Sequence, residues 1–132
     1  MTQEEKQLLL KDISARLPYG VKIYSDVGGD NTLLGIYGDR VFTTCEESDK
    51  HNDYPVECIK PYLRPMSTMM KEEKEEVRQR FCYEWEESIM ELYYSIEIRD
   101  IDCFIDWLNK HHFDYRGLIE KGLALEAPED MY

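Results

Sequence analysis

Two adjacent histidines, His111 and His112, together with the nearby Asp114, form the densest group of side chains that could carry out chemistry. Imidazole and carboxylate groups bind metal ions and transfer protons. Neighbouring residues on a helix point about 100° apart, so the two imidazoles are poorly placed to bind one metal ion. The His-Glu-x-x-His pattern of zinc peptidases is also absent. We therefore expect no metal site, and we place both histidines at a helix C-terminus, where positive charge is favoured.

The other signals for catalysis are weak. Cys103 lies two helical turns before His111, which is too far for a hydrogen bond along one helix. The sequence contains no Gly-x-Ser-x-Gly elbow and no phosphate-binding loop, and Gly28 and Gly29 are not followed by a helical pattern. We therefore predict no catalytic residue and no cofactor. An enzyme with a site around the two histidines and Asp114 stays open as an alternative.

Three segments carry a resemblance to a known group of proteins. They are 8–22 (LLLKDISARLPYGVK), 59–69 (IKPYLRPMSTM) and 106–132, which begins DWLNKHHFDYRGLIEKGLALEAP. Through these segments the chain resembles a family of short, uncharacterised proteins from gut Bacteroides-type bacteria and their mobile elements. No activity or catalytic residue is established for that family. The resemblance implies a bacterial, cytoplasmic protein of mobile-element origin, and it implies no particular function.

The composition is that of an ordinary globular chain. Of the 132 residues, 42% are hydrophobic and 33% are charged, which predicts a single folded domain over 1–132. No apolar run approaches the roughly 20 residues of a membrane span, and the acidic, polar N-terminus is unlike a signal peptide. The four cysteines show no Cys-x-x-Cys spacing. We therefore expect reduced, mostly buried thiols and a cytoplasmic location.

The charge is strongly negative and unevenly distributed. The net charge is −12. Residues 1–65 hold eight basic and eleven acidic side chains, whereas 66–132 hold eight basic and seventeen acidic ones. Phosphate backbones would repel such a protein, so direct binding to nucleic acid is disfavoured. A basic protein partner would suit the charge.

The order of patterns predicts an α+β fold. Thr2 and Glu5 form a capping-box pattern, and Pro18 disfavours helical geometry at the preceding residue, which places a helix within 1–17. Alternating apolar residues and tight turns predict a small antiparallel β-meander over 20–65, which could curl into an SH3-like roll. Pro55 places the last strand at an edge. The expected strands are 21–24, 32–37, 41–45 and 54–59, with an acidic loop over 46–53.

A helical part over 67–127 and a tail over 128–132 complete the prediction. Ser67 or Thr68 is the expected cap of a long helix over 68–98, which is too long for a compact domain. A bend near 81–83, or projection into a partner subunit, would resolve this. A second helix covers 101–108, and Asp114 is expected to cap a short one over 115–121 that ends at Gly122. The apolar stripe of the long helix consists of Val77, Phe81, Trp85, Ile89, Leu92 and Ile96.

The candidate binding residues combine aromatic, basic and titratable groups. Tyrosine and tryptophan are favoured where one side of the ring is apolar and the other is wet, as at protein interfaces. We therefore predict a non-enzymatic protein-interaction or regulatory module and leave homo-oligomerisation open. The alternative is an acidic antagonist that mimics nucleic-acid charge and uses the carboxylates of 84–106. The candidate binding residues are Trp85, Tyr93, Tyr94, His111, His112, Asp114, Tyr115 and Arg116.

Overall fold

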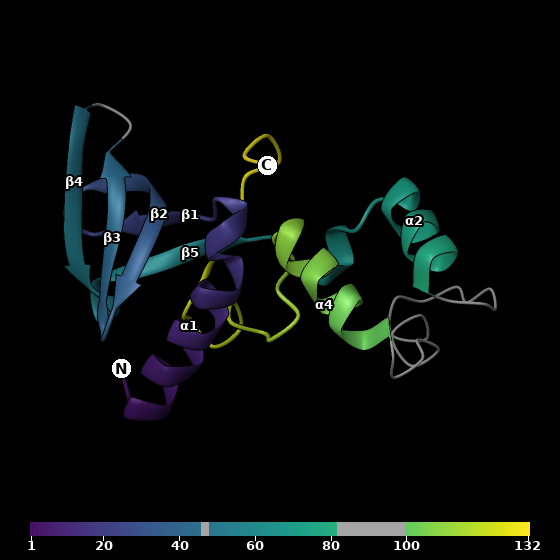
Figure 1. The fold of residues 1–132 in the computed structure, drawn as a ribbon, viewed down its shortest axis with the longest axis horizontal. Coiled ribbons are helices and arrows are strands. Elements are labelled where there is room, and N and C mark those ends of the chain that lie inside the picture. Colours follow the sequence, from purple (N-terminus) through teal and green to yellow (C-terminus); the bar gives the residue numbers. More distant parts are fainter. Residues whose placement is uncertain (46–47, 82–99) are drawn as a thin grey trace.

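The computed structural model describes residues 1–45, 48–81 and 100–132. Figure 1 shows the sheet and the N-terminal helix at one end of the molecule, with two further helices at the other end. No described helix is long and apolar enough to cross a membrane. The helices are α1 (Gln3–Arg16), α2 (Lys71–Phe81) and α4 (Ile101–Lys110). The strands are β1 (Lys22–Ser25), β2 (Gly29–Tyr37), β3 (Arg40–Cys45), β4 (Ser48–Pro55), β5 (Ile59–Leu63) and β6 (Leu125–Glu126).

The predicted N-terminal helix is confirmed with its cap. The Thr2 hydroxyl accepts a hydrogen bond from the Glu5 N–H at 3.1 Å, and the Glu5 carboxylate accepts one from the Thr2 N–H at 2.8 Å. Two N–H groups that a helix start leaves unpaired are thereby satisfied. The helix buries Leu9 and Ile13 against the sheet.

The strands form one open sheet in the order β4-β3-β2-β1-β5-β6. The first four strands are an antiparallel meander, as predicted, and Gly38 at φ +60° makes the turn between β2 and β3. After β4 the chain crosses to the other side of β1, where β5 pairs antiparallel with β1. β6 then adds a parallel edge beside β5. Because β4 and β6 are the two edges, the described strands do not close into a roll.

The position of β4 corrects the expected acidic loop. Residues 46–53 were predicted as loop and 54–59 as strand, but β4 runs from Ser48 to Pro55. It pairs with β3 from Arg40 to Cys45, and Pro55 ends it at the edge of the sheet. Pro55 thus lies in an edge strand, but the strand expected over 54–59 is wrong, because a 3-10 turn over Val56–Cys58 separates β4 from β5.

One face of the sheet carries the first apolar core. Inward-facing residues of the strands pack with α1 and with Leu118, Leu123 and Ala124 from the C-terminal part. β2 has a bulge between Leu33 and Gly35. Leu33 is buried in this core, whereas Leu34 is 45% exposed. The inward-facing strand residues of this core are Ile23, Leu33, Val41, Ile59 and Leu63.

The second apolar core lies between α2 and α4. Val77 and Phe81 of α2 are buried, in agreement with the predicted stripe. The predicted cap at Ser67 or Thr68 is wrong, because a 3-10 turn over Met66–Thr68 precedes α2 and the Glu73 carboxylate accepts the Met70 N–H at 3.0 Å. The remaining members of the stripe and the expected bend beyond Phe81 lie outside the described residues.

The C-terminal part departs most from its predicted form. α4 confirms the helix expected over 101–108, and its Phe104 and Leu108 are buried. Asp100 occupies the N-cap position without a capping hydrogen bond from its side chain. The short helix expected over 115–121 is replaced by turns, since Gly117 adopts φ +70° in the middle of it. β6 then lies within the region predicted to be helical.

Candidate functional site

The structure places five of the eight candidate binding residues in one segment that leads from α4 back to the sheet. Trp85, Tyr93 and Tyr94 lie outside the described residues. We call the segment from His111 to Arg116 the junction. It contains the candidates His111, His112, Asp114, Tyr115 and Arg116.

The backbone of the junction is bonded to the end of β5. The Arg64 N–H donates to the His112 carbonyl at 2.8 Å, and the Asp114 N–H donates to the Arg64 carbonyl at 2.8 Å. Phe113 thus forms a parallel bridge with Arg64. His112 adopts φ +62°, the left-handed conformation that a residue with a Cβ adopts only at a cost. These bonds hold the backbone of the junction against the end of β5.

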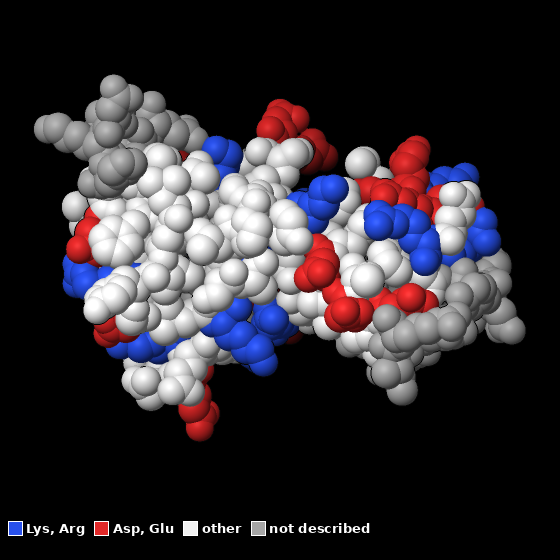
Figure 2. Space-filling view, in the orientation of Figure 1, with Lys and Arg blue, Asp and Glu red and all other residues white. Residues whose placement is uncertain are grey.

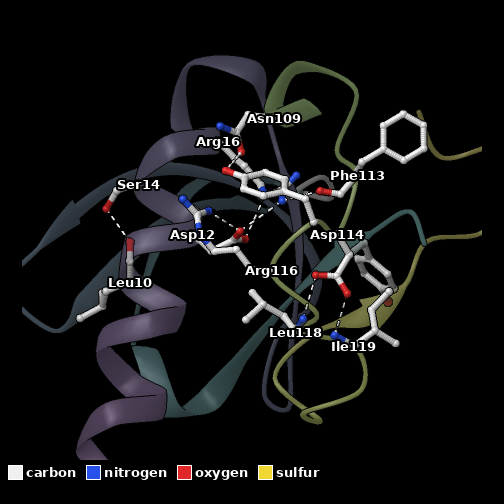
Figure 3. A network of polar contacts seen from close by, with 12 residues as sticks. Leu10, Asp12, Ser14, Arg16, Asn109, Phe113, Asp114, Arg116, Leu118 and Ile119 are labelled. Atoms are coloured by element: carbon white, nitrogen blue, oxygen red, sulfur yellow. Dashed lines mark hydrogen bonds and ion pairs between the residues drawn. The ribbon is translucent and has the colours of Figure 1, made fainter. Parts of the chain in front are cut away.

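A buried ion-pair network joins the junction to α1 (Figure 3). Arg16 is fully buried and donates to the Asp12 carboxylate at 2.9 and 3.1 Å and to the Phe113 carbonyl at 2.6 Å. Arg116 donates to the same carboxylate at 2.8 Å. Asp12 is itself fully buried. Two guanidinium groups therefore surround one carboxylate inside the protein, which satisfies the charge that burial would otherwise penalise.

Tyr115 and Asp114 also make internal contacts. The guanidinium carbons of Arg16 and Arg116 lie 5.4 and 4.7 Å from the centroid of the Tyr115 ring, and the Tyr115 hydroxyl donates to Asn109 at 3.0 Å. The Asp114 carboxylate accepts the N–H groups of Leu118 and Ile119 at 2.8 and 3.0 Å (Figure 3). Asp114 thus caps a turn, where the sequence predicted a helix.

His111 closes the junction towards α2. Its ring lies 4.3 Å from the Trp107 ring, and its Nδ1 lies 3.7 Å from the Glu73 carboxylate. Burial lowers the pKa of His111, and the nearby carboxylate opposes this effect. Glu73 in turn accepts two hydrogen bonds from Arg64, at 2.6 and 2.9 Å. The helix end predicted for this histidine is confirmed, since His111 is the C-cap residue of α4.

His112 holds the C-terminal residues in place. The ring is 6% exposed and stacks on the Tyr132 ring with centroids 3.7 Å apart. The Tyr132 hydroxyl accepts the Lys22 N–H at 2.9 Å and donates to the Tyr62 carbonyl at 2.8 Å, so it bridges β1 and β5 beyond their last direct pair. The expected tail over 128–132 is therefore anchored to the sheet.

The buried imidazole of His112 predicts a loss of stability in acid. Burial lowers its pKa from 6.5 to about 4, so the folded state resists a proton that the unfolded chain accepts below pH 6.5. Neutral His112 should contribute about 3 kcal/mol to the free energy of unfolding above pH 6.5, and this contribution should be lost as the pH falls towards 4. Urea denaturation between these pH values measures the loss. His112→Asn, which tolerates the left-handed conformation, should flatten the profile; a parallel decline in both proteins would contradict the assignment.

Cys103 lacks the lowered pKa that activates a cysteine as a nucleophile. Cys103 is exposed on α4, and neighbouring carboxylates, chiefly Asp102, raise the pKa of its thiol. Of the two cysteines whose side chains are described, Cys58 is half-buried and Cys103 exposed, so the expectation of buried thiols is wrong for both; both are free. No cluster of metal-binding side chains occurs within 1–45, 48–81 and 100–132.

Two candidate binding surfaces could not be predicted from sequence patterns. Both contain exposed apolar side chains. Apart from Met1, the exposed large apolar residues of the described chain lie either on the β-sheet half or beside a cavity near the C-terminal residues. Figure 2 shows an area with few charged side chains over the strands, whereas both acidic and basic side chains are frequent over α2 and α4. On the sheet half the residues are Val27, Leu34, Tyr37 and Phe42; beside the cavity they are Met70 and Tyr132.

The first surface is the outer face of the sheet, opposite α1. The register places Phe42 opposite Gly35 and Asp53, and Tyr37 opposite Arg40, all on the face away from the core. Tyr37 is 79% and Phe42 37% exposed. Arg40 and Asp53 form an ion pair at 2.7 Å beside them. The outer face is built from Tyr24, Leu34, Tyr37, Phe42 and Tyr62.

The second surface is a cavity of about 330 Å³ between the end of β5 and the C-terminal residues. Its walls come from segments distant in sequence that meet because β6 pairs parallel to β5. No local sequence pattern predicts this cavity, because each of its segments alone has the sequence of a turn. The lining residues are Arg64, Pro65, Thr68, Met70, Glu126, Ala127, Pro128, Glu129 and Tyr132.

Comparison with known proteins finds no matching family model, curated protein or solved structure.

Proposed function

We propose that the protein is a non-enzymatic, cytoplasmic interaction module that binds a partner protein through the outer face of its sheet. The observation that carries this proposal is the exposure of Leu34, Tyr37 and Phe42 on the outer face of the sheet. Contiguous apolar groups exposed on one face are typical of interaction sites, because contact with a partner removes them from water.

The chemistry of the face supports a protein partner. Tyrosine is enriched at interfaces because a large ring is buried at a low cost in conformational entropy. The Arg40–Asp53 ion pair lies beside the aromatic residues, as in the polar rim of an interface. The sequence predicted tyrosines of the long helix as interface residues, and those tyrosines lie outside the described residues. We propose instead that tyrosines of the strands contact the partner.

Two substitutions on the outer face of the sheet test the proposal. Tyr37→Ser and Phe42→Ser should each weaken a captured partner at least about tenfold, as expected for aromatic groups at the centre of an interface. Val27→Ser is the matched control, because Val27 is 83% exposed and lies in the turn between β1 and β2. Its affinity should stay within about twofold of the unsubstituted protein. The partner is first captured from a cytoplasmic extract, and affinities are then measured by calorimetry with purified proteins. Equal affinities for all four proteins would overturn the proposal.

Salt dependence separates this function from charge mimicry. The exposed Asp102 and Asp106 of α4 belong to the acidic segment that a nucleic-acid mimic would use. Binding through the aromatic face should weaken less than about tenfold between about 50 and about 500 mM salt, because screening acts on charges and leaves apolar contacts intact. A decrease of about a hundredfold or more, together with normal binding by Tyr37→Ser, would favour the mimic.

A further inference from the structure

The cavity beside the C-terminal residues is held open by the fold. Ala127 N–H donates to the Leu63 carbonyl at 2.8 Å, which fixes one wall to β5. The hydroxyl of Tyr132 fixes the other end through its two bonds to β1 and β5. A volume of about 330 Å³ is at the lower limit for small-molecule sites, so the cavity suits one side chain better than a nucleotide.

The charge that lines the cavity is negative. Among the described residues that line the cavity, only Arg64 is basic, and Glu73 neutralises it through two hydrogen bonds. The Phe113 ring also covers the Arg64 guanidinium, with 4.1 Å between its carbon and the ring centroid. Glu126 and Glu129 are exposed and make no ion pair with any described residue. Since His112 has a pKa of about 4, it adds no positive charge at neutral pH.

The apolar part of the lining suits the stem of a long side chain. Met70 is 57% exposed, and it lines the cavity together with Pro65 and Pro128. Tyr132 lines the cavity as well; the residue is 41% exposed, and its ring stacks on His112. An aromatic ring attracts a cation through its electron-rich face, and methylene groups favour contact with apolar residues.

The geometry points to a binding site for a lysine or arginine side chain of a partner polypeptide. The cationic head lies between Glu126 and Glu129 beside the Tyr132 ring, and the stem packs on Met70 and the two prolines. This site goes beyond the interaction face of the sheet and does not depend on it, because no residue of the outer face lines the cavity.

The test uses blocked amino acids as probes. N-acetyl-arginine amide and N-acetyl-lysine amide are titrated into isotope-labelled protein, and the amide signals of Met70, Ala127, Glu129 and Tyr132 are followed by NMR. We expect saturable shifts at millimolar probe concentration. N-acetyl-citrulline amide has nearly the same shape as the arginine probe without its charge, and it should bind at least about fivefold more weakly.

Two double variants decide whether the cavity is the site. Glu126→Gln with Glu129→Gln should weaken the arginine probe at least about fivefold. Glu4→Gln with Glu120→Gln removes two exposed carboxylates that do not line the cavity, and it should leave binding within about twofold. Equal binding of the citrulline probe, or equal weakening by both double variants, would overturn the site. Tighter binding of free 1,4-diaminobutane than of both blocked amino acids would show a small amine as the ligand and would overturn the assignment to a polypeptide. The sheet-face variants test the partner separately.

Discussion

Asp12→Ala should destabilise the protein by about 3–5 kcal/mol, because it leaves two guanidinium groups without their shared carboxylate. Arg16 and Asp12 are both fully buried, so solvent cannot replace the lost partner. Arg116 would lose its 2.8 Å hydrogen bond to the same carboxylate. The free energy of unfolding from urea denaturation measures the effect. This loss would be a large fraction of the total free energy of unfolding, since domains of this size are stable by only about 5–15 kcal/mol.

An exposed ion pair provides the control. Asp39→Ala removes a carboxylate that is 61% exposed and lies 3.4 Å from Lys6, so it should cost less than about 1 kcal/mol. Asp12→Asn keeps one acceptor oxygen, so its free energy of unfolding should lie between those of the alanine variant and the unsubstituted protein. A cost for Asp12→Ala as small as that of Asp39→Ala would show that the buried network contributes little.

Phe113→Ala should cost a similar amount, about 3–5 kcal/mol, for a different reason. The ring is fully buried, stacks on Trp107 with 5.9 Å between centroids, and covers the Arg64 guanidinium. Its loss would leave a cavity where the second core meets the end of β5. Urea denaturation measures the stability, and near-ultraviolet circular dichroism reports the packing of the remaining aromatic rings.

Phe42→Ala is the matched substitution for Phe113→Ala. The Phe42 ring is 37% exposed on the outer face of the sheet, so its truncation removes less buried area and leaves no enclosed cavity. We expect a cost below about 1.5 kcal/mol. Equal costs for the two variants would mean that the junction relaxes to fill the space left by Phe113.

Elements set by contacts within a few residues could be predicted from the sequence. The capping box of Thr2 and Glu5 fixes the start of α1 through two local hydrogen bonds. The turn at Gly38 depends on one left-handed residue, which glycine adopts at little cost. Strand β4 could not be predicted, since its first six residues are polar and become a strand only through pairing with β3.

The candidate site shows a second limit. The sequence predicts a group of candidate binding residues, and in the structure these side chains make internal contacts; sequence spacing cannot show whether a contact is internal or external. The residues are His111, His112, Asp114, Tyr115 and Arg116. Arg16 is a basic residue in the last turn of α1. It is buried because its partners include the Phe113 carbonyl, which lies far away in the sequence. The cavity went undetected for the same reason, because its walls meet only in the folded chain.

The parallel pairing of β5 with β6 also affects how the chain tolerates changes in length. The chain leaves the sheet at Leu63 and returns beside it at Leu125, so α2 and α4 belong to one long excursion between neighbouring strands. The entropy of closing a flexible loop rises only logarithmically, by about 0.6 kcal/mol for each doubling of its length. A modest change in the length of that excursion should therefore cost little closure entropy and should leave the pairing of β5 with β6 unchanged.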